Sequence, residues 1–282
     1  DMDILGRLRE EGLASKLIYE KILHSHPAAA RNRGLAKARG TYILYLGDDI
    51  VLAPDALSLH LDLHRRHEST ANSCPLAILG HVAGASPCPS KAFEHFARTN
   101  PYERIKDPND CGFLFFHTTC ISLRRELLQA VGGLDEKFAW YGWEDIDLGY
   151  RLERDKGLKI RYCKRIKAEH RHPQMSLDGL CNRERLSYMA LAYFLKKHPP
   201  SADPRLNALV WWTDIALRTR PDPRRRERGK KLIRFLESYL PLNGLLRLLY
   251  ERLISSYRIE GIREGHKILG RPRLDEPNQG KT

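Results

Sequence analysis

The sequence predicts an α/β protein with a mostly parallel sheet flanked by helices and followed by a helical extension. Over residues 27–131, short apolar segments typical of strands alternate with helical segments, and this order favours parallel strands joined by helical crossovers. From about residue 180 the alternation stops, and four helical stretches follow, separated by proline-containing turns. A chain of 282 residues is long enough for one large α/β domain with an appendage.

Three predicted elements precede the central strand. Apolar residues at helical spacing predict a helix over residues 4–13, and residues 16–22 form a plausible strand. Pro27 begins a second helix, since proline is tolerated in the first turn of a helix. Its alanines let this helix pack closely on the sheet, and Gly40 ends it.

The central strand lies within residues 41–54, TYILYLGDDIVLAP. Its apolar run between Gly40 and Gly47 is typical of a strand buried on both faces. Asp48 and Asp49 follow at its carboxyl end, where open α/β sheets bind ligands. Because side chains alternate along an extended chain, one carboxylate could hold a cation while the other binds a ligand hydroxyl. A polar loop after a strand is the alternative interpretation.

Strands and helices continue to alternate after this strand. A Ser90 cap predicts a short helix through Arg98, and the turn-rich residues 100–112 predict a loop over a site. The remaining elements are a helix from Pro54, strands at 76–82, 113–116 and 121–123, a helix at 124–131, and helices at 183–197, 205–219, 228–239 and 242–258.

A second acidic block occupies residues 132–152, GGLDEKFAWYGWEDIDLGYRL. Trp140, Tyr141 and Trp143 precede the adjacent acids Glu144 and Asp145 at the start of a predicted helix, and the helix dipole keeps acids in a first turn ionised. An ionised carboxylate beside aromatic rings is suited to deprotonate a sugar hydroxyl, with the rings available for stacking. An N-capping acid pair with core aromatics is the alternative. Further along this helix, Asp147 and Arg151 stand four residues apart and are expected to pair.

Two histidines, His170 and His172, follow the last predicted strand, at residues 158–163. Alternating histidines near the end of the sheet, in a chain that also has an aspartate pair, could supply a metal ligand. Packing or surface exposure is the alternative role.

These blocks, in this order, resemble the family 2 glycosyltransferases of the GT-A (Rossmann-like) fold. The segment AAARNRGLAKARGTYILYLGDDIVLAPDAL is similar to the family's Ala-Arg-Asn-x-Gly helix, strand and DxD-type motif. The segment 132–152 resembles its Gly-Gly-(Phe/Leu)-Asp-Glu…Gly-x-Glu-Asp-x-Asp-Leu block, and EHRHP with the following helix is also similar. The resemblance covers roughly residues 1–198.

The resemblance implies an inverting transfer of a sugar from a nucleotide-diphosphate sugar to a hydroxyl of a glycan or lipid-linked acceptor, dependent on Mn²⁺ or Mg²⁺. It implies that Asp145 is the catalytic base and that the metal ligands are Asp49 and His170, less surely His172. The other implied site residues fall into two groups: Arg31, Asp48 and Asp49 for the donor, and Glu144, Trp140 and Trp143 for the acceptor.

Three departures from the family pattern stand out. Gly47 replaces the first Asp of the DxD motif, and Cys120 stands where Asn is common. The family's first two nucleotide-binding strands have no counterpart, so the resemblance implies an N-terminally truncated catalytic domain. We expect this polypeptide alone to bind nucleotide sugar weakly.

The predicted domains are a catalytic domain at 1–181, a basic helical extension at 182–270 and a disordered tail at 271–282. Residues 1–181 carry 26 Lys and Arg against 24 Asp and Glu, whereas residues 182–282 carry 22 against 11, so most of the net charge of +13 belongs to the extension. Six scattered cysteines without a CxxC pair predict free thiols and a cytoplasmic location, and neither a signal peptide nor a membrane span is expected.

The basic extension suggests peripheral contact with an anionic membrane surface. Residues 250–262, YERLISSYRIEGI, mix aromatic, aliphatic and basic side chains as an interfacial helix does. A helix packed on the catalytic domain is the alternative. For the whole chain, a catalytically impaired domain that binds a glycan or a partner is the alternative to a transferase. Nucleic-acid binding ranks last, because no recognised motif supports it.

Overall fold

A computed structural model describes residues 18–20, 22, 26–70, 73–84, 91–98, 101–171, 175–241 and 244–270. The predicted helix at 4–13 and the predicted tail at 271–282 lie outside these ranges. The predicted strand at 16–22 lies partly outside them, and its described residues, 18–20 and 22, form no helix or strand.

The order of elements follows the predicted alternation closely. The elements are α2 (Pro27–Lys37), β1 (Tyr42–Leu46), β2 (Ile50–Leu52), α3 (Ala56–Glu68), β3 (Leu76–Gly84), α4 (Lys91–Arg98), η2 (Pro101–Arg104), η3 (Phe113–Phe115), β4 (Cys120–Arg124), α5 (Arg125–Ala130), α6 (Glu144–Lys156), β5 (Lys159–His170), α7 (Leu177–Lys197), α8 (Pro204–Arg218), α9 (Pro223–Glu237) and α10 (Gly244–Leu269).

The α/β class is confirmed, but the sheet is mixed rather than mostly parallel. The described strands lie in the order β1-β4-β3-β5-β2. Within this sheet β3 and β5 pair in parallel, whereas the β1–β4, β3–β4 and β2–β5 pairs are antiparallel. The prediction was wrong because not every connection is a helical crossover. The segment before β4 is the short 3-10 helix η3, and a turn of only three residues, 47–49, links β1 to β2.

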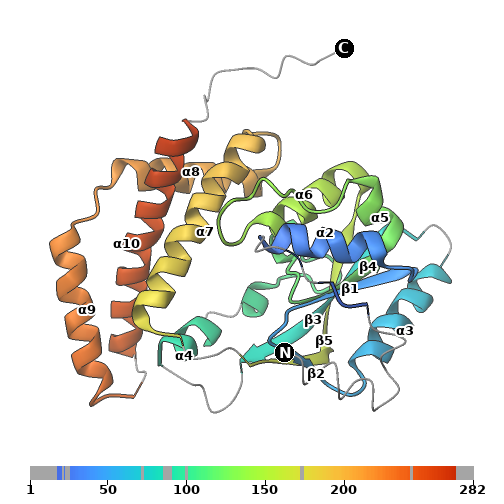
Figure 1. Cartoon of the computed structure of the whole chain (residues 1–282), viewed down its shortest axis with the longest axis horizontal. Coiled ribbons are helices and arrows are strands. Elements are labelled where there is room, and N and C mark those ends of the chain that lie inside the picture. Colours follow the sequence, from blue (N-terminus) through green and yellow to red (C-terminus); the bar gives the residue numbers. More distant parts are fainter. Residues whose placement is uncertain are drawn as a thin grey trace.

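Helices cover both faces of the sheet (Figure 1). On one face α2, α5 and α6 pack against the strands, and on the other face α3 does. The apolar cluster under α2, α5 and α6 includes Leu35, Leu128 and Leu148, and burying such side chains is the main stabilising contribution to the fold. The segment 113–116 forms η3 rather than the predicted strand, and Phe113 and Phe116 are both fully buried.

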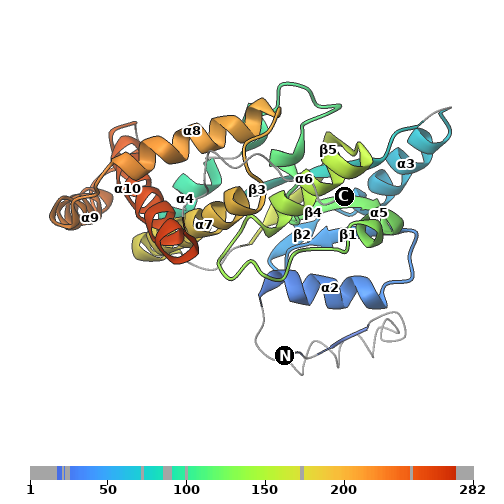
Figure 2. The same ribbon diagram turned by 90° about the horizontal axis from the view of Figure 1, so that it is seen from above.

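The last four helices form a second body beside the sheet (Figures 1 and 2). Helix α10 lies directly on α7: a Cβ added at Gly261 would come within 2.1 Å of the Arg185 carbonyl oxygen. Tyr250, Ile254 and Ile262 of α10 are buried. This burial favours the alternative interpretation of residues 250–262, a helix packed on the rest of the chain, and their predicted contact with a membrane stays a prediction. The predicted domain boundary at residue 181 falls inside α7.

None of the helices that the structure describes is both long and apolar enough to cross a bilayer.

Candidate active site

Two segments far apart in the sequence meet at the end of the sheet. The carboxylate Oδ2 of Asp49, in the turn after β1, lies 2.9 Å from Nε2 of His170, the last residue of β5. The backbone pairs there as well, since the Arg171 amide donates to the Asp49 carbonyl at 2.7 Å. The structure thus brings together the two residues predicted to bind metal. Asp48 is exposed, and His172 lies outside the described residues.

The turn containing Asp49 also explains Gly47. A Cβ at this position would come within 2.9 Å of the Ile50 side chain and 3.1 Å of Asp49 Oδ1. Both distances are too short for an undisturbed contact, so glycine is the residue that this turn accepts. An aspartate at Gly47 would force the turn to change.

The acids of the second block begin α6. Gly142 and Trp143 adopt left-handed φ values of +85° and +70°, and this tight turn starts the helix at Glu144. Glu144 is buried and accepts a hydrogen bond from Arg31 at 3.0 Å. Burial and the neighbouring charge of Asp145 nevertheless raise the pKa of Glu144 to about 7, because they outweigh the attraction of Arg31.

Asp145 has a different environment from its neighbour. Its side chain is 19% exposed, so a substrate can reach it. Its Oδ1 accepts a hydrogen bond from the Ile146 amide at 2.8 Å, and its Oδ2 lies 3.9 Å from Nδ1 of His117. Of the two adjacent acids, Asp145 is the more accessible, whereas Glu144 is buried and forms an ion pair with Arg31.

Tyr141 connects the two acidic blocks. Partial burial raises its pKa, and the carboxylates of Asp145, Glu144 and Asp49 raise it further, although the Arg183 charge opposes them. The same guanidinium lies 4.6 Å from the centre of the Tyr141 ring and donates to its hydroxyl. The charges of all three carboxylates therefore act on the Tyr141 side chain.

The two tryptophans predicted to stack on the acceptor are partly covered by other side chains. Trp140 and Trp143 are half-buried and pack against the apolar cluster formed with α7 and α8, and the Trp143 ring lies 5.3 Å from the Phe194 ring. Tyr141 is 45% exposed. It is the most exposed of the three aromatic side chains that the sequence predicted to be available for stacking.

Two residues of helix α2 form hydrogen bonds with the second acidic block, residues 132–152. The Asn32 side chain accepts from the Leu134 amide at 2.9 Å and donates to the Leu134 carbonyl at the same distance. Gly133 approaches it closely with a φ of +71°, and a Cβ there would lie 2.5 Å from Asn32 Oδ1. Arg31 and Asn32 of the Ala-Arg-Asn-x-Gly segment thus fix the turn before α6 and the first residue of α6.

Gly133→Ala tests this contact. We expect it to lower the free energy of unfolding by about 1–3 kcal/mol more than Gly132→Ala does, since both glycines have left-handed φ but only Gly133 faces Asn32. Urea denaturation of the two variants measures the difference. Equal losses in both variants would show that only backbone strain matters.

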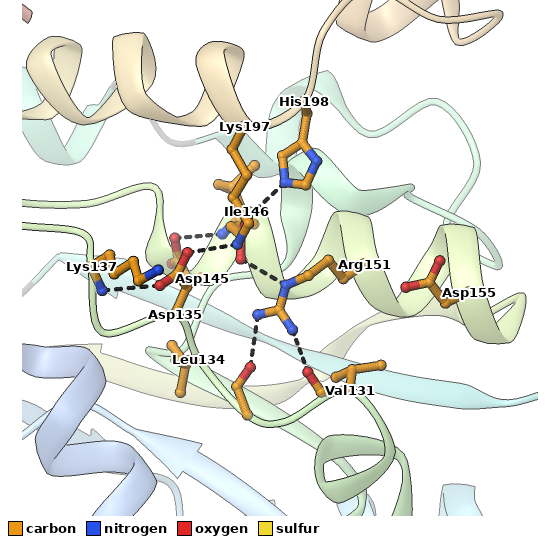
Figure 3. A network of polar contacts seen from close by, with 12 residues as sticks. Val131, Leu134, Asp135, Lys137, Asp145, Ile146, Arg151, Asp155, Lys197 and His198 are labelled. Atoms are coloured by element: carbon orange, nitrogen blue, oxygen red, sulfur yellow. Dashed lines mark hydrogen bonds and ion pairs between the residues drawn. The ribbon is translucent and has the colours of Figure 1, made fainter. Parts of the chain in front are cut away.

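Asp147 forms the buried centre of a charged network one turn into α6. The residue is fully buried, and its carboxylate accepts from Arg151 at 2.8 Å and from His198 at 2.7 Å and pairs with Lys197 at 2.8 Å. Arg151, Lys197 and His198 converge on this point from two helices (Figure 3). Burial alone would raise the Asp147 pKa, but these donors and charges overcome it and hold the pKa at about 2. The predicted Asp147–Arg151 pair is confirmed.

The same network reaches the loop before α6. Arg151 donates to the Val131 and Gly133 carbonyls at 2.7 Å each, and Lys197 donates to Asp135 at 2.7 Å (Figure 3). Lys197 and His198, at the C-terminal end of α7, therefore connect the helical extension to α6 and to the loop before it.

Cys120 lies away from these acids. It is fully buried, and its sulfur lies 3.6 Å from His60 of α3, on the opposite face of the sheet. The five cysteines that the structure describes are free thiols, and Cys88 lies outside the described residues. Within the described ranges no three His, Cys, Asp or Glu side chains are arranged to hold a metal ion by themselves.

Comparisons with known proteins agree with these features. The family model "Glycosyl transferase family 2" matches residues 7–132. The chain is 26% identical over 231 residues to the O-antigen biosynthesis protein RfbC of Myxococcus xanthus, an alignment that covers 76% of this chain and 18% of that protein. It is also 26% identical over 172 residues to a validoxylamine A glucosyltransferase of Streptomyces hygroscopicus, covering 52% of this chain and 39% of the relative. The chain thus spans well under half the length of these relatives.

A solved structure has the same fold. The mannosyltransferase PcManGT of Pyrobaculum calidifontis, in complex with GDP-Man and Mn²⁺, superposes with a TM-score of 0.54 at 13% identity, covering 93% of this chain and 74% of the other. The family model matched over residues 7–132 and the curated relatives make the chain similar to family 2 glycosyltransferases, and PcManGT shares its fold.

Proposed function

We propose that the chain transfers a hexose from a nucleotide-diphosphate sugar to a hydroxyl of a glycan or lipid-linked acceptor, with inversion and with the help of a divalent cation. The observation that carries this proposal is an Asp49–His170 pair at the end of the sheet, together with a partly exposed carboxylate, Asp145, at the start of α6; the charges of both acids raise the pKa of Tyr141. One end of this site holds an Asp–His pair, and the other holds a carboxylate that is free to accept a proton. The names of the relatives, an O-antigen biosynthesis protein and a glucosyltransferase, support sugar transfer.

Asp145 acts as the general base in this proposal. It takes the proton from the acceptor hydroxyl as that oxygen forms a bond to the anomeric carbon. The bond from the anomeric carbon to the diphosphate oxygen breaks, and the diphosphate leaves with the electron pair. One displacement inverts the configuration, and a single base suffices because no enzyme nucleophile takes part.

Tyr141 and Arg183 would border the substrates. The exposed face of the Tyr141 ring offers a stacking surface for a sugar, and Arg183 holds the ring from α7. The Arg31–Glu144 pair fixes the first turn of α6, and this orients the adjacent Asp145. In this proposal Tyr141 contacts the acceptor in addition to Glu144.

Asp49 and His170 fit a divalent cation. A carboxylate oxygen and an imidazole nitrogen at 2.9 Å supply two ligands of the kinds that Mn²⁺ accepts, and oxygen atoms of the diphosphate are the usual partners that complete such a site. When bound, the cation would stabilise the negative charge of the departing diphosphate. The Mn²⁺ and GDP-Man bound to PcManGT support this choice.

Asp49→Asn and His170→Ala test the cation site. We expect each to weaken Mn²⁺ binding in the presence of GDP or UDP by at least about tenfold, since each removes one of two protein ligands. Electron paramagnetic resonance of free Mn²⁺ measures the affinity. Asp155→Asn, an exposed acid at the far end of α6, is the matched control. Unchanged affinity in both site variants would exclude the Asp49–His170 pair as the metal site.

A further inference from the structure

The helical extension carries an exposed surface that the proposed chemistry does not use. Helix α9 lies at the edge of the molecule farthest from the sheet (Figures 1 and 2). Between α9 and α10 runs a groove of about 820 Å³, lined by arginines and aliphatic side chains. Its charged residues are five arginines and two acids: Arg220, Arg225, Arg226, Arg228 and Arg252, with Asp222 and Glu251.

The groove borders one continuous stripe on each helix. On α9 the stripe runs from Arg225 and Arg228 through Leu232 to Phe235, at spacings of three and four residues, and Tyr239 continues it in the turn that follows the helix. Such spacing places side chains on one helix face. The last three side chains of this stripe are 45%, 61% and 73% exposed. The α9 stripe is therefore basic at its start and apolar at its end.

Helix α10 repeats this arrangement in reverse order. Leu245 and Leu248, 55% and 48% exposed, precede Arg252 on the same face. We call the two stripes together the α9–α10 surface; its members are Arg225, Arg228, Leu232, Phe235, Tyr239, Leu245, Leu248 and Arg252. Its exposed apolar side chains lie toward the α9–α10 connection, and its arginines lie farther along both helices.

The arginines of this surface are available to a ligand. Arg225, Arg228 and Arg252 are exposed, and none of them forms an ion pair with any residue in the described ranges. Nearby basic residues differ, because Arg226 pairs with Glu260 and Lys230 with Asp178. Residues 218–234 contain nine Lys and Arg against two acids, so the surface strongly favours an anionic partner.

We propose that the α9–α10 surface binds the anionic surface of a lipid bilayer. Exposed leucines with a phenylalanine and a tyrosine are suited to the headgroup–acyl boundary, and the adjacent arginines are placed to bind lipid phosphates. A second copy of the chain is disfavoured, because a two-fold contact would bring two sets of unpaired arginines together. Exposed leucines among the aromatic side chains favour the acyl boundary of a bilayer, because leucines, unlike Phe235 and Tyr239, cannot stack on the bases of a nucleic acid.

Vesicle co-sedimentation of the 282-residue chain tests the proposal. We expect binding to phosphatidylcholine vesicles that contain phosphatidylglycerol, little binding to pure phosphatidylcholine, and weaker binding as salt rises. The double variant Arg225→Gln/Arg228→Gln should lower the partition coefficient roughly 30-fold, since each basic side chain near an anionic surface contributes about fivefold. Phe235→Ser/Tyr239→Ser should lower it about tenfold or more.

A charge-matched variant serves as the control. Arg39→Gln/Lys156→Gln removes two exposed positive charges at the ends of α2 and α6, remote from α9, and should bind vesicles as the unmodified chain does. Circular dichroism melts check that every variant folds, and the substituted side chains are exposed. Vesicle binding does not involve sugar transfer, so this experiment tests the membrane contact independently of the proposed enzymatic function.

Four outcomes would overturn the proposal: equal binding to neutral vesicles, equal losses in the surface and control variants, a dimer in solution that Phe235→Ser/Tyr239→Ser dissociates, or tighter binding of single-stranded RNA than of anionic vesicles at the same salt.

Discussion

Asp145→Asn is expected to lower the turnover of sugar transfer by about 10²–10⁴-fold while leaving the melting temperature unchanged. The asparagine oxygen can still accept the hydrogen bond that the Ile146 amide gives to Oδ1 at 2.8 Å. The amide cannot take a proton from an acceptor hydroxyl, so the change removes the base and keeps the local structure. Initial rates of nucleotide diphosphate release, measured across UDP-, GDP- and dTDP-hexoses, give the comparison.

Glu144→Gln is the matched control for this experiment. It changes the neighbouring acid, which is buried against Arg31, and we expect a smaller loss of rate together with a lower melting temperature. If Glu144→Gln abolished transfer and Asp145→Asn did not, the two roles would have to be exchanged. If neither changed the rate, the base would lie outside this block.

Asp147→Asn is expected to lower the free energy of unfolding by about 3–5 kcal/mol, because it leaves Arg151 and Lys197 beside a buried neutral amide. Urea denaturation at neutral pH measures the change. Asp155→Asn removes a comparable but exposed charge pair on the same helix, with Arg154, and should cost no more than about 1 kcal/mol. A similar small loss at both positions would show that the buried network contributes little.

The Asp147 network also predicts how stability depends on pH. Its pKa of about 2 in the folded chain lies below the value of about 3.9 for an unfolded aspartate. The folded chain therefore holds its proton less tightly, and the stabilisation is complete above about pH 4 and is lost as pH falls towards 2. Asp147→Asn should remove this part of the acid dependence, which denaturation curves at stepped pH would show.

The local patterns in the sequence predicted most elements and the main acidic residues. The strand before Asp49 and the helix after Trp143 were predictable, since an apolar run and a glycine turn are signals carried by neighbouring residues. The Asp147–Arg151 pair was predictable for the same reason, because helical geometry fixes the distance between positions four apart.

Features that depend on long-range pairing were not predictable. The antiparallel pairing of β4 with both β1 and β3 depends on partners far along the chain, and no local signal fixes it. The directions of Trp140 and Trp143 depend on the left-handed turn at Gly142 and on contacts with α7 and α8. Arg183, which follows Tyr141 by 42 residues, becomes part of the site only through the placement of α7.

The attachment of α7 at both ends has a mechanical consequence. Arg183 near its start contacts Tyr141, Lys197 and His198 at its end bind Asp147, and α10 packs along it through Gly261. Because these contacts join α7 rigidly to α6, the orientation of α9 relative to Asp145 is set by the fold. If α9 rests on a bilayer, Asp145 stands at a fixed height above the lipid, and the length of the acceptor chain then decides which hydroxyl reaches it.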